Sequence, residues 1–364
     1  MSANVVRITT HPLKIGMTDP LATSLNTYEA LNSVIVRIEA ADGTAGYGEA
    51  RECVHITGET QPGVIAAIEN FLSPAIAGLD TFDLTEAHRR MDAAIAGNSA
   101  AKSAIDIALH DLAGKQSGLP ISRLLGGGPR GPVASSKAVS VASSERMVAQ
   151  AQKFADAGFG TLKIKTGVDA AAEIEAIRFI REAVGHEVAL KLDANQGWLL
   201  HDATRFLKAV ERFDILMVEQ PLPAWDLAGA AQLRRRTAIP VMLDEGVHTP
   251  RDALRAVDMA AADHINIKLL KTGGLKPATD IAAICAAAGI TCQIGTLDTS
   301  IGSAAAVHLV HACPVIAHAE INGPTRIAFD IATGFRVHDG YAILDDGPGL
   351  GLTVDDAALA GANP

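Results

Sequence analysis

The chain has 364 residues, of which 48% are hydrophobic and 20% are charged, and its formal net charge is −10. This length exceeds the usual compact domain but suits a barrel of about 200–250 residues joined to a smaller domain. An acidic chain without a basic cluster interleaved with aromatic residues does not belong to the nucleic-acid-binding classes, so we expect no nucleic acid partner.

The cysteines and the first residues indicate a compartment. Cys53, Cys285, Cys292 and Cys313 form no CxxC pair and show no metal-ligand spacing, which is typical of a reducing environment. The opening residues, MSANVVRITTHPL, lack the apolar core of a signal peptide, and no stretch of about 18 uncharged apolar residues follows. We therefore expect a cytoplasmic protein without a membrane partner.

Residues 1–129 predict an α+β domain. Residues 5–50 alternate as strands do, and Asp42-Gly43 between two apolar runs predicts a hairpin. Helical periodicity then appears in GVIAAIENFLSPAIAG, DLTEAHRRMDAAIAG and NSAAKSAIDIALHDLAGKQSG. The last of these should begin with a cap at Asn98 or Ser99 and end at Gly118. The Gly/Pro-rich segment LLGGGPRGPV, residues 124–133, is the predicted domain boundary.

Residues 130–336 predict a second, repetitive domain. Eight apolar runs, with helical stretches between them, are KAVSVAS, TLKIKTG, VALKLDAN, ILMVEQP, IPVMLDEG, HINIKLLK, TCQIGTLD and IAHAEINGP. The polar residues that close successive runs lie about 24–28 residues apart, which is one βα unit. This pattern predicts a (β/α)7β-type TIM barrel. The remaining segment, 337–364, should form a hairpin and return to the first domain, which would then cap the barrel.

Three consecutive runs end in carboxylates: Asp193, Glu219 and Asp244. Active sites of such barrels lie at the carboxyl ends of the strands. Three hard oxygen ligands from neighbouring strands are the incomplete octahedron that Mg²⁺ prefers, and Mn²⁺ accepts the same ligands. Each carboxylate could instead cap the following helix, but three in succession favour a divalent metal site.

Lysines close the second and sixth runs, on opposite sides of the predicted ring. Lys165 and Lys268 become useful bases near neutral pH only if their pKa values fall below the ordinary value of about 10.4. Lys163 projects from the same strand face as Lys165, and its positive charge would lower the pKa of Lys165. Alternatively, Lys163 pairs with a carboxylate such as Asp193 inside the barrel, and both roles are compatible.

Two bases that face each other across a metal-bound carboxylate predict a reaction class. A proton α to a carboxylate is removable only if the developing enediolate is stabilised as it forms, which a divalent cation does. One lysine would remove the proton and the other would return it to the opposite face, which gives racemisation or epimerisation. Elimination of a β-substituent or cycloisomerisation by the same residues is the alternative. A Schiff-base aldolase and a barrel that only binds ligands fit the three carboxylates less well.

The motifs LKIKTG, KLDANQGW, VEQPL, LDEG and NIKLLKTGGL resemble the enolase superfamily, in particular its muconate lactonizing enzyme subgroup with a KxK second strand. GYGEA, TGET, AAKSAIDIALHDL, LPISRLLGG and PGLGLTVDD extend the resemblance to nearly the whole chain. The resemblance implies Lys165 and Lys268 as the acid/base pair and Lys163 as their electrostatic partner. It also implies Asp193, Glu219 and Asp244 as Mg²⁺ ligands.

Within this subgroup the chain is most similar to the L-Ala-D/L-Glu (dipeptide) epimerases. Their eighth strand carries a DxD that holds the ammonium of the dipeptide, whereas this chain has Glu320 and Asn322 in AEINGP, which favours another substrate. The seventh strand reads TLDTS, with Asp298 as a candidate substrate contact. Arg51 and Thr57, in RECVHITGET, lie where the capping loop of the family closes over substrate.

Two further residues are expected to support the metal ligands. Asn195 lies on the same face as Asp193, and Glu245 follows Asp244, so both should brace the carboxylates. Together these features predict a Mg²⁺-dependent racemase or epimerase of a small-molecule carboxylate, an amino-acid derivative or dipeptide-like compound. We expect the enzyme to be a homo-oligomer.

Overall fold

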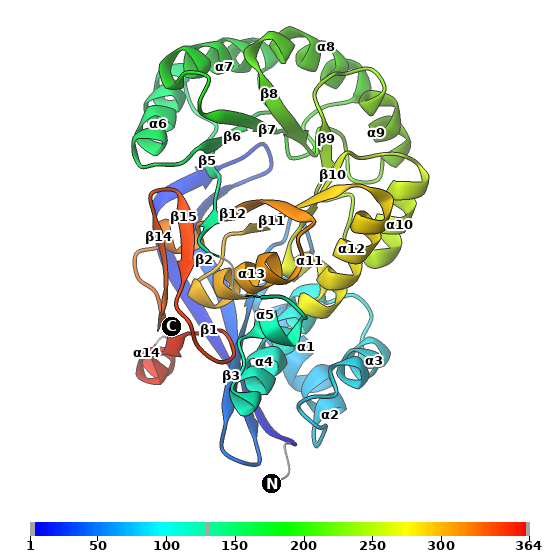
Figure 1. The fold of residues 1–364 in the computed structure, drawn as a ribbon, viewed down its shortest axis with the longest axis vertical. Coiled ribbons are helices and arrows are strands. Elements are labelled where there is room, and N and C mark those ends of the chain that lie inside the picture. The colour runs from blue at the N-terminus through cyan, green and yellow to red at the C-terminus, as the bar shows by residue number, and fades with distance from the viewer. Residues whose placement is uncertain (1–3, 129–130, 362–364) are drawn as a thin grey trace.

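The computed structural model describes residues 4–128 and 131–361 and shows an antiparallel sheet with helices packed beside a ring of parallel strands (Figure 1). The predicted boundary at residues 129 and 130 lies outside the described residues, so the division into 1–129 and 130–336 stays a prediction. No helix within the described ranges combines the length and the apolar character needed to cross a membrane.

The first part of the chain contains a three-stranded antiparallel sheet in the order β1 (Val5–Ala22), β2 (Thr27–Ala40), β3 (Ala45–Arg51). The hairpin predicted at Asp42-Gly43 joins β2 to β3, with Gly43 at a φ of 85°. The helices of this part are α1 (Gln61–Ala67), η1 (Ile68–Leu72), α2 (Ser73–Ile76), α3 (Leu84–Ala94), α4 (Ser99–Ser117) and α5 (Ile121–Leu124).

Helix α4 is the centre of this first part. It begins after Asn98 and ends at Gly118, whose φ of 72° is the left-handed conformation that glycine adopts readily, so both predicted ends are confirmed. The helix packs directly on β3 at GYGEA. A Cβ atom added to Gly48 would lie 1.9 Å from the carbonyl oxygen of Ala104, so only glycine permits this close approach. This packing fixes the end of β3, where Arg51 lies.

Eight parallel strands form the second part, in the order of the chain. They are β5 (Lys137–Val139), β6 (Thr161–Lys165), β7 (Ala189–Asp193), β8 (Ile215–Glu219), β9 (Val241–Leu243), β10 (His264–Ile267), β11 (Thr291–Thr296) and β12 (Ile316–Ile321). The backbone N–H of Ser136 donates to the carbonyl of Ala319 at 2.8 Å, which brings the first strand against the last. The predicted (β/α)7β barrel is confirmed.

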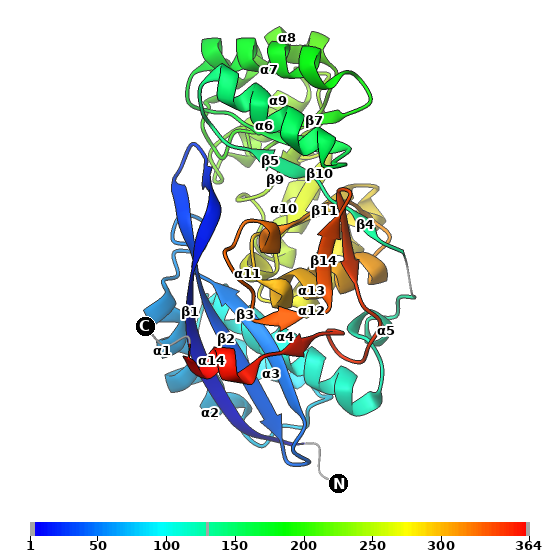
Figure 2. The same cartoon turned by 90° about the vertical axis from the view of Figure 1, so that its left-hand side faces the viewer.

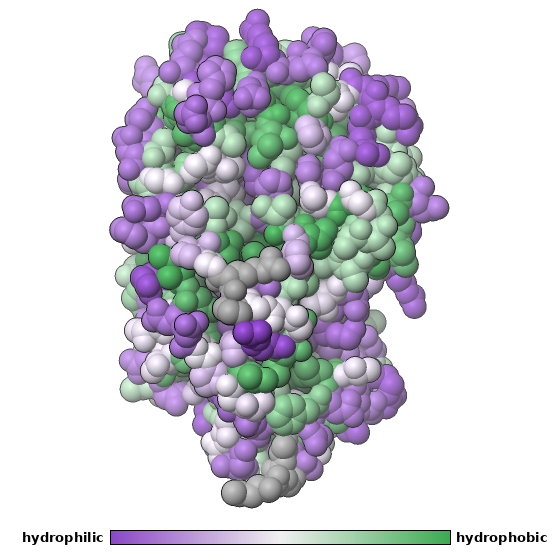
Figure 3. Space-filling model, in the orientation of Figure 1, coloured by the Kyte–Doolittle hydropathy of each residue, from purple (hydrophilic) through white to green (hydrophobic). Residues whose placement is uncertain are grey.

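Helices separate these strands and cover the outside of the barrel (Figure 1). They are α6 (Ser144–Asp156), α7 (Ala170–Val184), α8 (Leu200–Val210), η2 (Glu211–Phe213), α9 (Leu227–Arg234), α10 (Pro250–Asp258), α11 (Leu269–Thr272), α12 (Leu275–Ala288) and α13 (Ser300–Ala312). Hydrophilic side chains gather at the rim where α7 and α8 lie (Figure 3). There Arg178 pairs with Glu182 at 2.8 Å and Lys208 with Glu211 at 2.7 Å, so this rim carries both signs of charge.

The alternation of side chains along the strands positions the site. In β6, Leu162 and Ile164 are fully buried in an apolar cluster with residues of the neighbouring helices, whereas Lys163 and Lys165 belong to the opposite face. The two lysines therefore point into the barrel together, as predicted.

The end of the chain contacts both parts. After η3 (Gly323–Thr325) and β13 (Ala332–Thr333), the predicted hairpin forms from β14 (Phe335–His338) and β15 (Tyr341–Leu344), and β15 pairs with β4 (Val133–Ala134). The N–H of Ile121 then donates to the carbonyl of Gly349 at 3.0 Å, and the Tyr47 hydroxyl donates to Asp356 Oδ1 at 2.7 Å. Two short elements, β16 (Thr353–Val354) and α14 (Asp356–Gly361), follow.

The long β1–β2 hairpin reaches from the first sheet to the barrel (Figure 2). Near its tip, Ser24 Oγ donates to the carbonyl of Ala194 at 2.8 Å, and the N–H of Val141 donates to the carbonyl of Ala22 at 3.1 Å. Ala194 directly follows β7, so the hairpin lies over the carboxyl ends of the strands, where the polar side chains gather.

Candidate active site

Three buried carboxylates lie at the ends of neighbouring strands. Asp193 ends β7, Glu219 ends β8 and Asp244 follows β9, and each is at most 1% exposed. Burial is the largest cause that raises the pKa of Glu219 to about 7. The charge of Lys163 lowers this pKa, whereas repulsion from Asp193 and Asp244 raises it further. The three carboxylates are therefore close enough to repel one another.

Lys165 and Lys268 approach this cluster from opposite sides. Lys165, at the end of β6, donates to Asp193 Oδ2 at 2.7 Å and to Asn195 Oδ1 at 2.8 Å. Lys268, directly after β10, donates to Asp244 Oδ2. Burial opposes the charged form of Lys268, but Asp244 and other carboxylates outweigh it and raise its pKa. Each lysine thus contacts a different carboxylate of the same cluster.

Lys163 lies within hydrogen-bond distance of three carboxylates. Its Nζ is 3.0 Å from Glu219 Oε1, 2.7 Å from Glu320 Oε2 and 3.1 Å from Asp193 Oδ2. Burial would lower the pKa of Lys163, but these carboxylates raise it well above its ordinary value. The alternative role, pairing with a carboxylate such as Asp193, is therefore confirmed. An effect of Lys163 on the pKa of Lys165 stays a prediction.

The donor set fits a divalent cation. Asp193, Glu219 and Asp244 supply three oxygen ligands from adjacent strands, which is the hard-ligand arrangement that Mg²⁺ and Mn²⁺ accept. Within the described ranges Glu245 Oε2 is buried without a hydrogen-bond partner, and burial beside Asp244 raises the pKa of Glu245 to about 7. Among the described residues, no three acidic, histidine or cysteine side chains already form a finished metal site. The lysine ammonium groups instead hold the carboxylates in this structure.

Two residues of a polar layer below the carboxylates, Asn266 and Gln293, were not predicted from the sequence. Asn266 Nδ2 donates to Glu219 Oε1 at 2.8 Å, and Gln293 Nε2 donates to Glu219 Oε2 at 3.2 Å. Lys191 donates to Gln293 Oε1 at 2.7 Å. Asn266 lies two residues before Lys268, so the period-two alternation that placed the lysines on one face was a signal for this residue as well.

Lys271, Asn195 and Glu245 hold the loops that follow the strands. The completely buried Lys271 donates to Asp244 Oδ1 at 2.5 Å and to the carbonyl of Val247 at 3.1 Å. The Asn195 backbone N–H donates to Asp193 Oδ1 at 3.0 Å, and its side-chain amide donates to Glu245 Oε1 at 3.2 Å. These contacts agree with the supporting roles predicted for Asn195 and Glu245.

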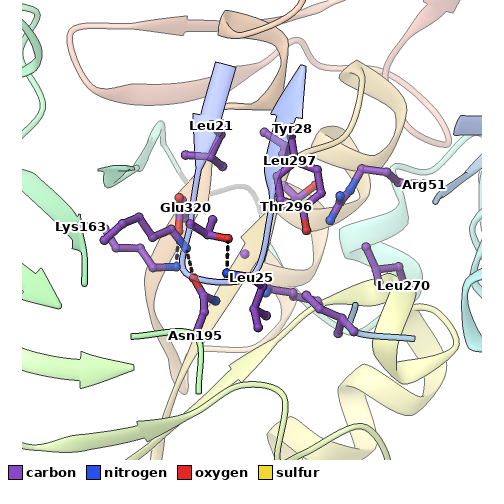
Figure 4. A pocket seen from close by; sticks show the side chains of 15 residues that line it. Leu21, Leu25, Tyr28, Arg51, Lys163, Asn195, Leu270, Thr296, Leu297 and Glu320 are labelled. Atoms are coloured by element: carbon purple, nitrogen blue, oxygen red, sulfur yellow. Dashed lines mark hydrogen bonds and ion pairs between the residues drawn. The ribbon is translucent and has the colours of Figure 1, made fainter. Parts of the chain in front are cut away.

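A cavity of about 70 Å³, named here the catalytic cavity, lies between the barrel and the β1–β2 hairpin (Figure 4). It is lined by Leu21, Thr23, Leu25, Tyr28, Arg51, Ile56, Lys163, Lys165, Asn195, Lys268, Leu270, Gly295, Thr296, Leu297 and Glu320. The three metal-ligand candidates do not line it, because the lysines that contact them lie between them and the cavity. All three predicted catalytic lysines therefore face one space.

The predicted substrate contacts divide into two groups. Arg51 and Glu320 line the catalytic cavity, whereas Thr57, Asp298 and Asn322 do not. The Thr57 hydroxyl donates to the carbonyl of Cys53 at 3.3 Å, within its own loop.

The other two residues of the second group are also engaged outside the cavity. Asp298 Oδ2 accepts a hydrogen bond from Thr296, and its Oδ1 lies 3.4 Å from Arg51 Nε. The Asn322 amide donates to the carbonyl of Ser136 at 2.5 Å, where it joins β12 to the start of the barrel. No sequence pattern indicates that the side chains of Thr57, Asp298 and Asn322 point away from the cavity.

Two family descriptions match the chain. "Mandelate racemase / muconate lactonizing enzyme, N-terminal domain" matches residues 6–126, and "Enolase C-terminal domain-like" matches residues 146–358. The chain belongs to the enolase superfamily. Its membership in the mandelate racemase/muconate lactonizing enzyme branch confirms the resemblance drawn from LKIKTG, KLDANQGW and the other motifs.

Relatives in this superfamily cover nearly the whole chain. An L-Ala-D/L-Glu epimerase of Clostridium acetobutylicum is 38% identical over 93% of this chain and 96% of its own length. An N-succinyl-L-Arg/Lys racemase of Bacillus cereus is 31% identical over 98% of this chain and 96% of its own.

A solved structure extends the similarity to three dimensions. The dipeptide epimerase of Cytophaga hutchinsonii, complexed with Mg and D-Ala-L-Val, matches with a TM-score of 0.95 and 30% identity over 99% of this chain and 98% of its own. These relatives confirm the predicted enzyme class, an epimerase or racemase of the enolase superfamily.

Proposed function

We propose that this enzyme interconverts the two configurations at the α-carbon of a carboxylate. One of the two lysines, Lys165 or Lys268, removes the α-proton, and the other donates its own proton to the opposite face of that carbon. One observation carries the proposal: both lysines line the catalytic cavity, and each donates to a different carboxylate of the cluster between them. A substrate whose carboxylate lies at this cluster would have one lysine on either side of its α-carbon.

Asp193, Glu219 and Asp244 would hold the metal ion, Mg²⁺ or in its place Mn²⁺. When bound, a divalent cation supplies positive charge beside the substrate carboxylate, where negative charge develops as the α-proton leaves. Asn266 and Gln293 would keep Glu219 oriented, because each donates to a different oxygen of this carboxylate. Relatives crystallised with Mg support this assignment.

The lysines do the proton transfer. In one direction Lys165 enters as the neutral amine and accepts the α-proton, while Lys268 enters as the ammonium and donates its proton to the opposite face. The reverse direction exchanges these roles. Asn195 Oδ1 accepts a hydrogen bond from Lys165 at 2.8 Å and would stabilise the ammonium that forms there. The β1–β2 hairpin covers the site and limits the access of water.

The substrate contacts and the cellular setting form part of the same proposal. Among the predicted contacts, Arg51 and Glu320 have the position to touch a small-molecule carboxylate substrate, whereas Thr57, Asp298 and Asn322 would act through neighbouring residues. Four free cysteines are compatible with the expected cytoplasmic location. A homo-oligomer is expected as well, because closed symmetric assemblies are the commonest state of such enzymes.

Deuterium exchange tests the proposal. Purified enzyme with Mg²⁺ is incubated in D₂O with a panel of N-acyl amino acids, dipeptides and proline derivatives, and the mass and chirality of each compound are measured. We expect α-deuterium incorporation together with inversion for one group of compounds. The double variant K165A/K268A should show neither. Loss of a β-substituent or ring closure without inversion would instead assign the enzyme as a dehydratase or a cycloisomerase.

A further inference from the structure

Arg51 brings an almost unpartnered guanidinium into the catalytic cavity. Its side chain is 8% exposed and lies at the end of β3, and among the described residues its one hydrogen bond runs from Nη2 to the sulfur of Cys53 at 3.7 Å. Arginine has five donors, and buried donors without acceptors are costly. The guanidinium therefore has donors left for a further acceptor.

Asp298 compensates the charge of Arg51 without filling its donors. Asp298 Oδ1 lies 3.4 Å from Arg51 Nε, but neither atom makes a hydrogen bond within the described residues. The ring of Tyr28 lies 5.8 Å from the guanidinium carbon, so a cation–π contact adds to this compensation. Arg51 lines the catalytic cavity, and among the described residues Nη1 makes no hydrogen bond, so this donor is available to a carboxylate, which the planar fork of arginine suits.

The positions of Arg51 and Lys163 show which parts of a bound substrate each would contact. Figure 4 shows Arg51 at one end of the catalytic cavity and Lys163 with Glu320 at the other. A substrate whose reacting carboxylate lies beside the lysines would thus present its distal end to Arg51. The side chains between the two ends include Leu21, Leu25 and Leu297, which suit an apolar linking segment.

A second cavity continues beyond Arg51. This outer cavity has a volume of about 240 Å³, against about 70 Å³ for the catalytic cavity. Tyr28, Arg51 and Leu297 line both, and Lys14, Asn32 and Glu52 line the outer cavity alone. Small-molecule sites usually measure about 300–1,000 Å³, so a substrate larger than a few atoms needs both spaces and must pass Arg51.

We propose that Arg51 is a specificity-determining residue that binds a second carboxylate at the distal end of the substrate. The inference rests on the proposed function and narrows it: the substrate is an α-carboxylate compound whose acyl group or side chain ends in another carboxylate. The alternative is that Arg51 only links the first domain to the barrel through Asp298. That alternative leaves Nη1 without a role.

Binding measurements test this proposal without requiring turnover. The Mg²⁺-loaded enzyme is titrated calorimetrically with N-succinylglycine and with its neutral analogue N-succinamoylglycine, which differ only in the distal group. We expect the acid to bind roughly tenfold to a hundredfold more tightly, as for a charge-assisted hydrogen-bonded pair. Arg51→Met should remove this preference, and Arg51→Lys should restore part of it. Thermal unfolding of each variant shows whether it is folded.

Asp298→Asn is the matched control, because this substitution removes the ion pair that links Arg51 to the barrel but keeps the guanidinium of Arg51. It should retain the preference for the acid. Equal binding of acid and amide by the wild-type enzyme would overturn the proposal, and so would an Asp298→Asn variant that loses the preference as completely as Arg51→Met.

A parallel assay follows α-deuterium exchange of the N-succinyl and N-succinamoyl derivatives of alanine. We expect Arg51→Met to raise KM for the succinyl compound while kcat changes little. If neither compound exchanges although the acid binds preferentially through Arg51, the proposed proton transfer fails and the assignment of Arg51 stands.

Discussion

Lys163 Nζ donates to Glu320 Oε2 at 2.7 Å, from β6 to β12, the strands on either side of β5 in the closed ring. Glu320 is the one carboxylate among the described residues that line the catalytic cavity, and this contact already neutralises it. Asn322 offers no second acceptor, because its side chain points away to Ser136. The cavity is therefore poor in acceptors for a cation and rich in groups that bind anions.

Dipeptides with a free α-ammonium group should consequently be poor substrates. Burying an ammonium without a dedicated carboxylate typically costs several kcal/mol, which corresponds to at least a tenfold loss in kcat/KM. The measurement compares α-deuterium exchange in L-Ala-L-Glu with that in its N-acetylated form, and we expect the acetylated compound to react faster. Efficient epimerisation of the free dipeptide would show that Glu320 is released from Lys163 when substrate binds.

Removal of the metal should abolish turnover reversibly. Treatment with EDTA is expected to stop α-exchange, and Mg²⁺ or Mn²⁺ should restore it, because the lysines alone do not stabilise the charge that develops on the substrate. Mg²⁺ should also raise the melting temperature. At a Mg²⁺ concentration of a hundred times its Kd, binding adds about 2.7 kcal/mol to the free energy of unfolding. Glu219→Gln should lose this stabilisation, whereas Glu211→Gln, a half-buried change at the rim beside Lys208, should keep it. Exchange at the full rate in metal-free enzyme would exclude the proposed mechanism.

The two lysines should be distinguishable by the enantiomer that each deprotonates. Because Lys165 and Lys268 contact the carboxylate cluster from different sides, Lys165→Ala should stop α-proton exchange of one enantiomer and Lys268→Ala that of the other. Both variants should abolish net racemisation. The measurement is deuterium incorporation into each pure enantiomer, monitored by mass.

A variant that retains exchange for both enantiomers would contradict this assignment. In that case a single lysine suffices for the chemistry, as expected for a dehydratase or a cycloisomerase. Lys276→Met serves as a comparison, because Lys276 pairs with Asp280 and does not line the cavity.

The strand ends were predictable from the sequence because burial imposes a pattern there. A strand of a parallel barrel alternates apolar and inward-facing residues, so TLKIKTG, VALKLDAN and the runs that follow revealed both the strands and the polar residues that close them. The same alternation indicated Asn266, which went unnoticed beside the more conspicuous lysine of NIKLLK.

Loop side chains were not predictable in the same way. The directions of Asp298 and Asn322 depend on contacts with Thr296, Arg51 and Ser136, which are far away in the sequence or set by local turns. Tyr28 was missed for a similar reason. It reaches the site only because the β1–β2 hairpin docks on the barrel, and neither periodicity nor spacing records such a contact.

Lys137 should make the stability of the protein depend on pH. Its ammonium lies among the rings of Phe154 and Phe159, at 5.7 and 5.8 Å, and donates to Thr325. Burial, with the nearby charge of Arg326, lowers its pKa from 10.5 to about 7. Between these two values the unfolded chain binds more protons than the folded protein, so the free energy of unfolding rises as the pH is raised from about 7 to 10.

At about 1.4 kcal/mol for each pH unit between the two pKa values, the effect amounts to roughly 5 kcal/mol. Below pH 7 Lys137 is charged in the folded protein, and the full cost of burying its ammonium lowers the free energy of unfolding. Lys137→Met should therefore stabilise the protein at pH 6–7 and flatten the rise above pH 7 in urea unfolding measurements. Lys208→Met, an exposed change whose charge does not act on Lys137, should leave the pH profile unaltered. An unchanged profile in Lys137→Met would mean that Lys137 stays charged in the folded protein.

Gly48→Ala should disrupt the packing that positions Arg51. The added methyl group would lie 1.9 Å from the carbonyl oxygen of Ala104 and 2.8 Å from the nitrogen of Ala108, both backbone atoms of α4 that cannot rotate away. Overpacking against a backbone costs about 3 kcal/mol or more, so the variant should unfold at a clearly lower urea concentration and lose activity. Gly16→Ala in β1 is the control, because a methyl group there meets no atom within 4 Å. Unfolding of both variants at the wild-type urea concentration would contradict the close contact between β3 and α4, and with it the fixed position of Arg51 at the end of β3.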